Sequence, residues 1–245
     1  ITIHLPPQSL FAQHVFPLLY SLAPFYYFWP DERLFRIANV ILLAAAAFPL
    51  YLCALKITRH GALSFTLALC YLFSPFVLSA AIWDFHDIAF AAPILACIYL
   101  ALLAGNKRWF IIACVALLLV KEHYGLAVMG FGLLWGWHHR QWRFGAMLAA
   151  AGIVIAVVMI TVVLPMFSPT GVYFMLEEGK RYAWLKDPLR YQHMLSFITL
   201  DGSIYFIVIG LGGLLTPYLA WPWLLPGTAD LAVNLASLGS MMRSP

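Results

Sequence analysis

The sequence has few charged residues, and this scarcity excludes an ordinary soluble domain. Asp, Glu, Lys and Arg make up 10% of its 245 residues, whereas hydrophobic residues make up 64%. Soluble domains carry about 25% charged residues. The chain also lacks the basic surface that binds nucleic acid, since its formal net charge is only +4. We therefore expect an integral membrane protein whose main partner is the lipid bilayer, with no nucleic-acid partner.

Closely spaced cysteine pairs are also missing. Each of the 4 cysteines lies inside an apolar run without a CxxC spacing, so we predict reduced, buried side chains with no disulfide or metal role. They are Cys53, Cys70, Cys97 and Cys114. Because the chain opens on Ile1 rather than Met, we also expect a fragment of a longer protein.

Long apolar runs are what the sequence has in abundance. They predict one all-α domain, residues 1–245, folded as a polytopic bundle of membrane helices. Clear spans are expected at 34–55 and 61–83, with kinks at Pro49 and Pro75, and at 144–164. Ser74, just before the second proline, is expected to satisfy a backbone group that this kink leaves free.

Shorter apolar runs extend the bundle to about seven to eight spans, some of them short or re-entrant. Residues 88–104 and 109–120 are expected to form a helical hairpin, and 124–137 a short span with Gly132 and Gly136 in a GxxxG motif for close packing. Residues 202–229 carry no charge, but prolines divide them into two short helices.

Two segments are predicted to lie outside the bilayer. Residues 1–33 are aromatic and broken by Pro17, Pro24 and Pro30, which favours short helices in the interface, on the extracytoplasmic side. Residues 165–201 are expected to form an extracytoplasmic loop with an interfacial helix. The short loops on the other side hold Lys and Arg without any acid, which marks them as cytoplasmic.

Two charged islands interrupt the apolar runs, on either side of the predicted hairpin. Because a hairpin returns its ends to one side, we expect the islands to meet at the extracytoplasmic face. The second island follows a run of only about 18 Å, shorter than a hydrocarbon core of about 30 Å, so it is expected in a recess. The residues are Asp84, His86 and Asp87, and Lys121, Glu122 and His123.

The chemistry of these islands leaves several interpretations open. Charge at membrane depth costs about 2.5–3.5 kcal/mol, which favours a functional site over simple helix capping by Asp84 and Asp87. Carboxylates beside a lysine suit acid/base work on a hydroxyl, phosphate binding, or coordination of a divalent metal ion. The histidines leave a transition metal open as well, so the residues do not decide the cofactor.

Several motifs resemble a known family. The stretch from Asp84 to Pro93 resembles the Phe-His-acid motif of the bacterial multi-pass proteins catalogued as domain of unknown function 2079. Lys121-Glu122 is similar to that family's Lys-Glu pair, and the stretch beginning at His14 to its His-x-x-Pro element. The stretch from Trp223 to Leu235 is similar to its late Leu-Pro and Asn-Leu segment. The resemblance implies a bacterial inner membrane protein.

The resemblance also implies a GT-C-like glycosyltransferase that uses a polyprenyl-phosphate sugar. In that interpretation Asp87 or Glu122 acts on the acceptor hydroxyl, Asp84 supports the site, and Lys121 holds the donor phosphate. The other expected substrate contacts are His86, His123, His14, Lys180, Arg181 and Trp184. The carboxylate expected after a first span has no match here, since Asp31 and Glu32 directly precede a span that would be a later one.

Other function classes remain open on the sequence. Recessed charges between proline-broken helices are also typical of a transporter, although no inverted repeat is evident. A non-catalytic subunit would instead pack against partner membrane subunits through its apolar surface. Three outcomes distinguish these function classes. A glycosyltransferase turns over a lipid-linked sugar, a transporter shows gradient-driven uptake, and a non-catalytic subunit shows neither.

Overall fold

The computed structural model describes residues 14–168, 171–172 and 221–227. Regular structure in these residues is entirely helical, as the sequence predicts for an all-α chain. The chain divides into two compact units, one from Phe16–Lys121 and the other from Ile1–Val15 and Glu122–Pro245. Each unit is described below by itself.

The first unit opens with two short helices, as the prolines predict. The 3-10 helix η2 covers Pro17–Leu22 and α1 covers Ala23–Phe28, each with a proline in its first turn. Proline is tolerated there because the first N–H groups of a helix have no partner within it. Neither helix buries a residue, and the side chains of Tyr27 and Phe28 are 82% and 85% exposed.

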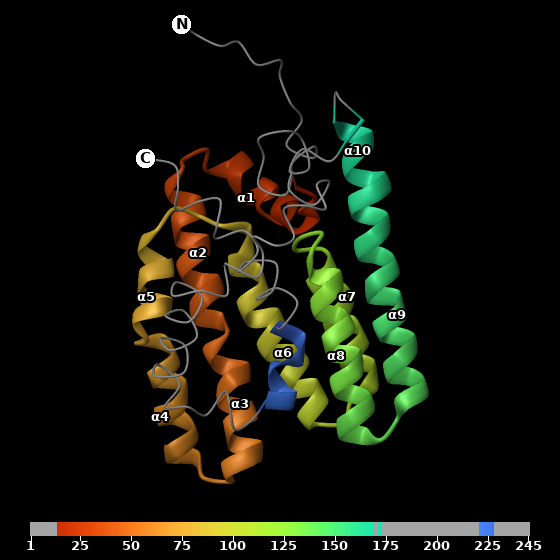
Figure 1. Ribbon diagram of the computed structural model, residues 1–245. Helices are drawn as coiled ribbons and strands as arrows, with labels where there is room; N and C mark the ends of the chain where they lie inside the picture. Colours follow the sequence, from red (N-terminus) through yellow and green to blue (C-terminus); the bar gives the residue numbers. More distant parts are fainter. Residues whose placement is uncertain (1–13, 169–170, 173–220, 228–245) are drawn as a thin grey trace, which may run out of the picture. The chain divides into compact units, whose positions relative to one another are not determined.

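The next helices form the first candidate span. Helices α2 (Arg33–Ala45) and α3 (Ala47–Thr58) join into an apolar helix of 26 residues, Arg33–Thr58 (Figure 1). The pair separates at Ala46, three residues before Pro49, whose missing N–H leaves the carbonyl of Ala45 without its helical donor. The kink predicted at Pro49 thus corresponds to a break of one residue within a single candidate span.

A sharper bend follows in the second candidate span. Helix α4 covers Gly61–Leu72 and α5 covers Pro75–Ile82, and their axes differ by 44°. The hydroxyl oxygen of Ser74 accepts a hydrogen bond from the N–H of Val77 at 3.2 Å. This bond caps the helix that begins at Pro75, which confirms the role predicted for Ser74.

A helical hairpin completes the first unit, as predicted. After the 3-10 turn η3 (Asp87–Phe90), α6 (Ala91–Leu103) packs against α7 (Lys107–Leu118). Gly105 makes the connection with a positive φ of 64°, and the Asn106 side chain accepts from the N–H of Trp109 at 3.2 Å. The turn chemistry explains why the hairpin closes so tightly.

The second unit is built on a pair of closely packed helices, α8 (Tyr124–His139) and α9 (Trp142–Val158). A Cβ on Gly132 would lie 2.7 Å from both the backbone N of Ala149 and the backbone O of Gly145. Gly125 would likewise meet the carbonyl oxygen of Gly152 at 2.6 Å. The glycines therefore let the two backbones touch, and the close packing predicted from GxxxG is confirmed.

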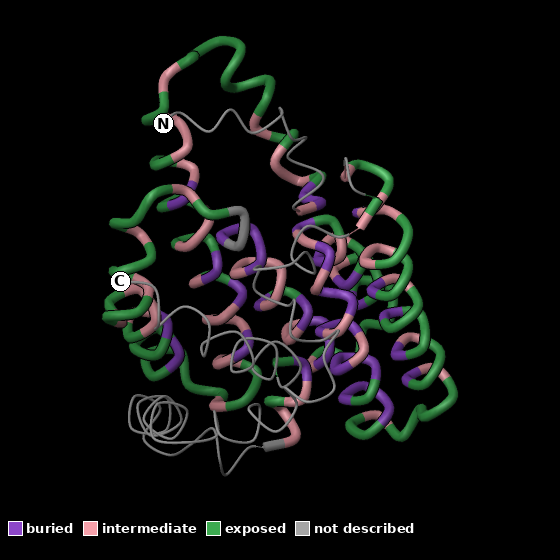
Figure 2. Tube along the Cα trace, turned by 45° about the horizontal axis from the view of Figure 1, so that its top comes forward, coloured by how far each residue is buried: buried purple, intermediate pink, exposed green. Residues whose placement is uncertain are grey.

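Helix α8 is buried along much of its length (Figure 2), and α9 continues into a longer apolar helix. A π-helical turn, η4 (Met159–Val163), and α10 (Leu164–Phe167) extend it to a further candidate span, Trp142–Phe167. The last segment of the chain that the structure describes, 221–227, begins with the 3-10 turn η8 (Trp221–Leu224).

In the part of the chain that the structure describes, two helices are long and apolar enough to cross a membrane, or three if the bent pair α4 and α5 is one span. Helix α6 is a shorter apolar helix. The total of seven to eight spans and their sidedness remain predictions. The interfacial helix expected within 165–201 and most of the run 202–229 lie outside the described residues.

Candidate functional site

Glu122 is the one charged side chain that is buried within the described ranges. It lies in the turn between α7 and α8, and its side chain is 4% exposed. One carboxylate oxygen lies 2.8 Å from Nδ1 of His14. The other accepts the backbone N–H of Val15 at 3.1 Å. Both oxygens are thus engaged by residues more than a hundred positions earlier, and all of these groups belong to the second unit.

Packing around Val15 explains how this early segment reaches Glu122. Val15 is buried against Leu164, which is fully buried at the start of α10, with Met159, Ile160 and Val163 packed around them. Burying an aliphatic side chain stabilises the folded protein by about 1.5–3 kcal/mol. Once Val15 is anchored there, its N–H and the preceding imidazole both face the carboxylate.

The hydrogen bonds set the charge of Glu122. Burial alone would raise its pKa, because it disfavours the ionised form. The hydrogen bond and electrostatic attraction of the His14 ring, with the backbone N–H groups of Glu122 itself and Val15, outweigh burial and lower the pKa below its ordinary value. Glu122 is therefore a carboxylate at neutral pH, not a protonated acid.

The geometry also assigns the two nitrogens of the His14 ring. Nδ1 faces the carboxylate, which is an acceptor only, so Nδ1 carries a hydrogen and donates. Nε2 is left for a second partner, and the side chain is 28% exposed. A histidine held in one tautomer by a buried carboxylate is the arrangement by which proteins make a general base or a proton relay.

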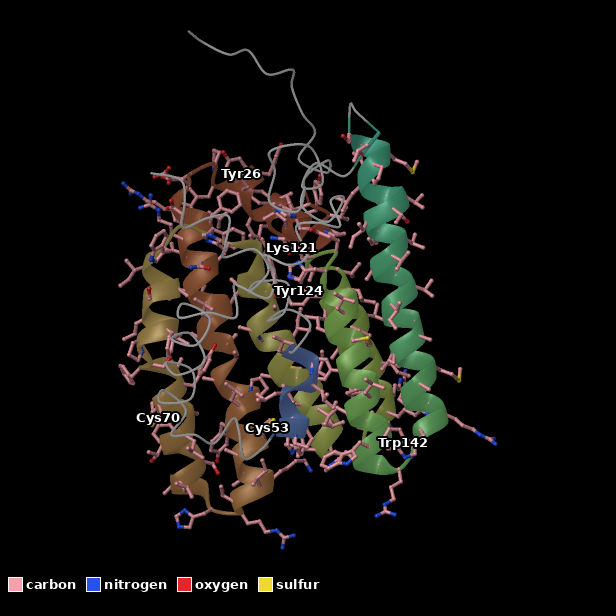
Figure 3. The ribbon with its side chains drawn as sticks, viewed as in Figure 1. Tyr26, Cys53, Cys70, Lys121, Tyr124 and Trp142 are labelled. Carbon is pink, nitrogen blue, oxygen red and sulfur yellow. The ribbon has the colours of Figure 1, made fainter. Side chains whose placement is uncertain are left out.

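The neighbours of Glu122 divide between the two units. Tyr124 begins α8 (Figure 3). His123 is half-buried and packs its ring on that of Tyr124, with centroids 4.6 Å apart. Lys121 is half-buried and is the last residue of the first unit. Asp84, His86 and Asp87 also belong to the first unit, so the predicted meeting of all six residues at one face stays a prediction.

In the first charged island Asp84 and His86 are exposed, whereas Glu122 is buried. The Asp84 side chain is 88% exposed, with a carboxylate oxygen 3.8 Å from a guanidinium nitrogen of Arg36. Nδ1 of His86 lies 2.7 Å from the backbone oxygen of Asp84, which is a local turn contact. Phe85 holds this turn by packing between Phe35 and Phe90, with centroids 5.7 and 6.1 Å away.

The structure excludes capping of the hairpin helix by Asp84. Helix α6 begins without a side-chain cap, so Asp84 does not cap it. The backbone of Asp87 begins η3, but its side chain is not described. The contact of η2 with η3, and the bond from Leu18 N–H to the Leu119 carbonyl at 3.1 Å, place the start of α6 and the end of α7 at one end of this unit.

Several predicted site residues lie outside the described ranges, namely Lys180, Arg181 and Trp184. No group of three or more His, Cys, Asp or Glu side chains suited to a metal ion occurs in the described ranges. The pairing of His14 with Glu122 was not predicted. Each residue belongs to a separate motif, and only the shared family resemblance links them.

The family comparison agrees with these motifs. A family model described as "Predicted membrane protein (DUF2079)" matches residues 3–244. The chain belongs to this family. As a DUF2079 member it is a membrane protein, and the match includes His14, the first charged island and Glu122. No curated protein and no solved structure matches the chain.

Proposed function

We propose that this DUF2079 protein is a membrane glycosyltransferase, which moves a sugar from a polyprenyl-phosphate donor to an extracytoplasmic acceptor. The observation that carries the proposal is the buried, ionised Glu122 fixed to Nδ1 of His14. A buried charge in a membrane protein is costly, so a residue of this kind usually marks a functional site. The reaction class comes from the resemblance of this family's arrangement to the GT-C glycosyltransferases.

In the proposed reaction His14 is the base. The acceptor hydroxyl gives its proton to Nε2 while its oxygen bonds to the sugar carbon, and the bond from that carbon to the phosphate oxygen breaks. Polyprenyl phosphate leaves with the electron pair. Glu122 stabilises the imidazolium that forms and keeps the ring oriented.

This mechanism gives Glu122 a different role from the one the sequence suggested. A direct base needs a free oxygen and a pKa near the working pH, whereas both oxygens of Glu122 are engaged and its pKa is lowered. Glu122 is thus a positioning residue. Asp87 remains the alternative base. Asp84, which is exposed and paired with Arg36, helps to hold the first charged island in place.

The remaining contacts in the proposal are those implied by the family likeness. Lys121 meets the donor phosphate as a point charge. The others are His86, His123, Lys180, Arg181 and Trp184. A metal ion is not required for the proton transfer by the dyad.

The test uses purified full-length protein with labelled polyprenyl-phosphate sugars. His14→Ala should lower donor consumption by about 10²–10⁴-fold, the usual contribution of a positioned base, and added imidazole should restore part of it. Glu122→Gln should lower the rate and change its pH profile, because an amide cannot stabilise the imidazolium. Equal consumption by folded wild type and His14→Ala would remove the dyad from the mechanism.

A matched control separates this effect from loss of any carboxylate. Glu32 is also paired through its carboxylate, with Arg36 at 3.3 Å, but it is 80% exposed. Glu32→Gln should therefore keep the wild-type rate. If it lost activity to the same extent, the dyad would have no special role.

The same dyad favours one second candidate. A buried carboxylate–imidazole pair in a membrane protein also suits a proton pathway in a transporter. In that case proteoliposomes would show proton-driven uptake that Glu122→Gln abolishes, and no lipid-linked sugar would be consumed. A subunit without activity of its own would show neither.

A further inference from the structure

An apolar groove of about 320 Å³ runs between α3 and α4, within the first unit. Its volume is within the range of about 300–1,000 Å³ that holds small ligands. Leu50, Ala54 and Ile57 line it from α3, and Leu67 and Tyr71 from α4. These two helices pack side by side (Figure 3). The span from Leu50 to Ile57 gives a length of roughly 10 Å along the helix.

The polar groups that line the groove are already satisfied by the protein. The Tyr71 hydroxyl donates to the backbone oxygen of Leu43 at 2.9 Å. The Thr58 hydroxyl lies 2.9 Å from that of Ser64 and accepts the N–H of His60 at 3.2 Å. An occupant therefore gains nothing by bringing polar groups into the groove, which points to a hydrocarbon chain.

The loop at the end of the groove is basic. Thr58, which lines the groove, is followed by Arg59 and His60, and both are exposed. Arg59 ends α3 in the left-handed conformation with φ 54°. Nδ1 of His60 accepts from the N–H of Leu63 at 3.2 Å, so its hydrogen is on Nε2, which is a donor. Lys56 adds a further cation in the last turn of α3.

No acid offsets these charges in the surrounding sequence. Residues 33–83 contain no Asp or Glu. A guanidinium binds phosphate oxygens through paired N–H groups, and basic sites between membrane helices recognise anionic headgroups. An apolar groove that ends at an arginine thus matches a lipid with an anionic headgroup.

We propose that this groove binds an anionic phospholipid, with one acyl chain between α3 and α4 and the phosphate at Arg59. The occupant is a lipid of the surrounding bilayer, and the site is separate from the Glu122–His14 dyad in sequence and chemistry. It does not depend on the proposed transferase activity.

The experiment uses the full chain purified in detergent, with lipid retention measured by native mass spectrometry. Phosphatidylglycerol and phosphatidylcholine with identical acyl chains are compared. The wild type should retain phosphatidylglycerol more strongly. Arg59→Gln should weaken that preference about fivefold, the effect of one cation near a lipid surface. Equal retention of the two lipids by the wild type would overturn the proposal.

The control is a matched arginine in the second unit. Arg140 also ends a helix in the left-handed conformation, with φ 55°, and it is exposed. Arg140→Gln removes the same charge from the same backbone geometry, but Arg140 ends α8, whereas Arg59 directly follows the groove residue Thr58. It should leave the preference unchanged. A loss equal to that of Arg59→Gln would indicate general surface charge and overturn the site.

Two further arms test the groove and the source of the phosphate. Ala54→Phe fills the groove without changing charge, so it should lower phosphatidylglycerol retention. Inorganic phosphate has no chain for the groove and should not displace the lipid. Unchanged retention in a folded Ala54→Phe, or displacement by inorganic phosphate, would show that the apolar groove does not hold the lipid.

Discussion

At the scale of single residues, Glu122 shows how a buried charge is kept in an apolar protein. Its carboxylate would be unstable alone, and two donors from the segment around His14 make it stable as an ion. Removing either partner therefore affects more than one contact. The pH dependence of folding is the most direct way to observe this.

We predict that Glu122→Gln makes the folded chain less sensitive to acid. The folded pKa of Glu122 is below its ordinary value, so its ionised form stabilises the fold above the unfolded pKa of about 4.3. That stabilisation is lost as the pH falls through the lower, folded pKa. The free energy of unfolding at neutral pH should fall by about 1–3 kcal/mol in the variant.

The measurement is the thermal unfolding midpoint of the full chain in micelles, between pH 7 and pH 3. The wild type should lose more stability than Glu122→Gln over the acid part of this range. Glu32→Gln should follow the wild type, because Glu32 is exposed. Parallel curves for wild type and Glu122→Gln would mean that Glu122 is not ionised in the fold.

Much of this site was visible in the sequence as separate residues. The sequence predicts Glu122 as a site residue because a charge follows a short apolar run, and it predicts His14 by resemblance to the family. Their pairing was not predictable, because it depends on Val15 packing against Leu164. Nothing local to His14 indicates that distant partner.

At the scale of helices, proline and glycine placed the irregularities correctly. Pro75 with Ser74 predicts the bend between α4 and α5, and the bend is 44°. Gly132 and Gly136 predict the contact between α8 and α9. The π turn η4 and the 3-10 turn η3 were missed, since neither has a residue signature as strong as a mid-span proline.

We predict that Gly132→Ala separates α8 from α9. The new Cβ would lie 2.7 Å from backbone atoms of Gly145 and Ala149, which cannot rotate away as a side chain can. Such overpacking costs about 1–3 kcal/mol. The measurement is the thermal midpoint of the purified chain in detergent, which should fall.

Gly61→Ala is the control for this change. A Cβ on Gly61 meets nothing within 4 Å, and Gly61 is the first residue of α4. Its midpoint should stay near the wild-type value or rise slightly, because alanine favours a helix. Equal loss in both variants would assign the effect to glycine itself and not to the contact.

At the scale of the whole molecule, the membrane topology is the largest prediction still to be tested. The basic loops Lys56–His60, Gly105–Arg108 and His138–Arg143 are expected on the cytoplasmic side, and the carboxylates on the other side. Composition predicts that the chain is a membrane protein, and family membership supports it. Composition does not fix the number of spans, because α6 and α8 are shorter than an ordinary span.

Cysteine labelling tests this topology. In a chain with its native cysteines replaced, Arg108→Cys and Arg143→Cys should resist an impermeant thiol reagent in intact cells and react after permeabilisation. Both positions are exposed on the protein, so burial does not protect them. Glu32→Cys, also exposed, should react from outside. Reaction of Arg108→Cys from outside would contradict the predicted membrane topology.

The close contact of α8 and α9 has a consequence for biosynthesis. Their backbones touch through glycines, so Cα–H groups of one helix can bond to carbonyl oxygens of the other. The two helices are consecutive and joined by a short turn at Arg140 and Gln141. Contacts this local form quickly. The pair can therefore assemble during translation, as soon as both helices enter the membrane and before the rest of the chain has been synthesised.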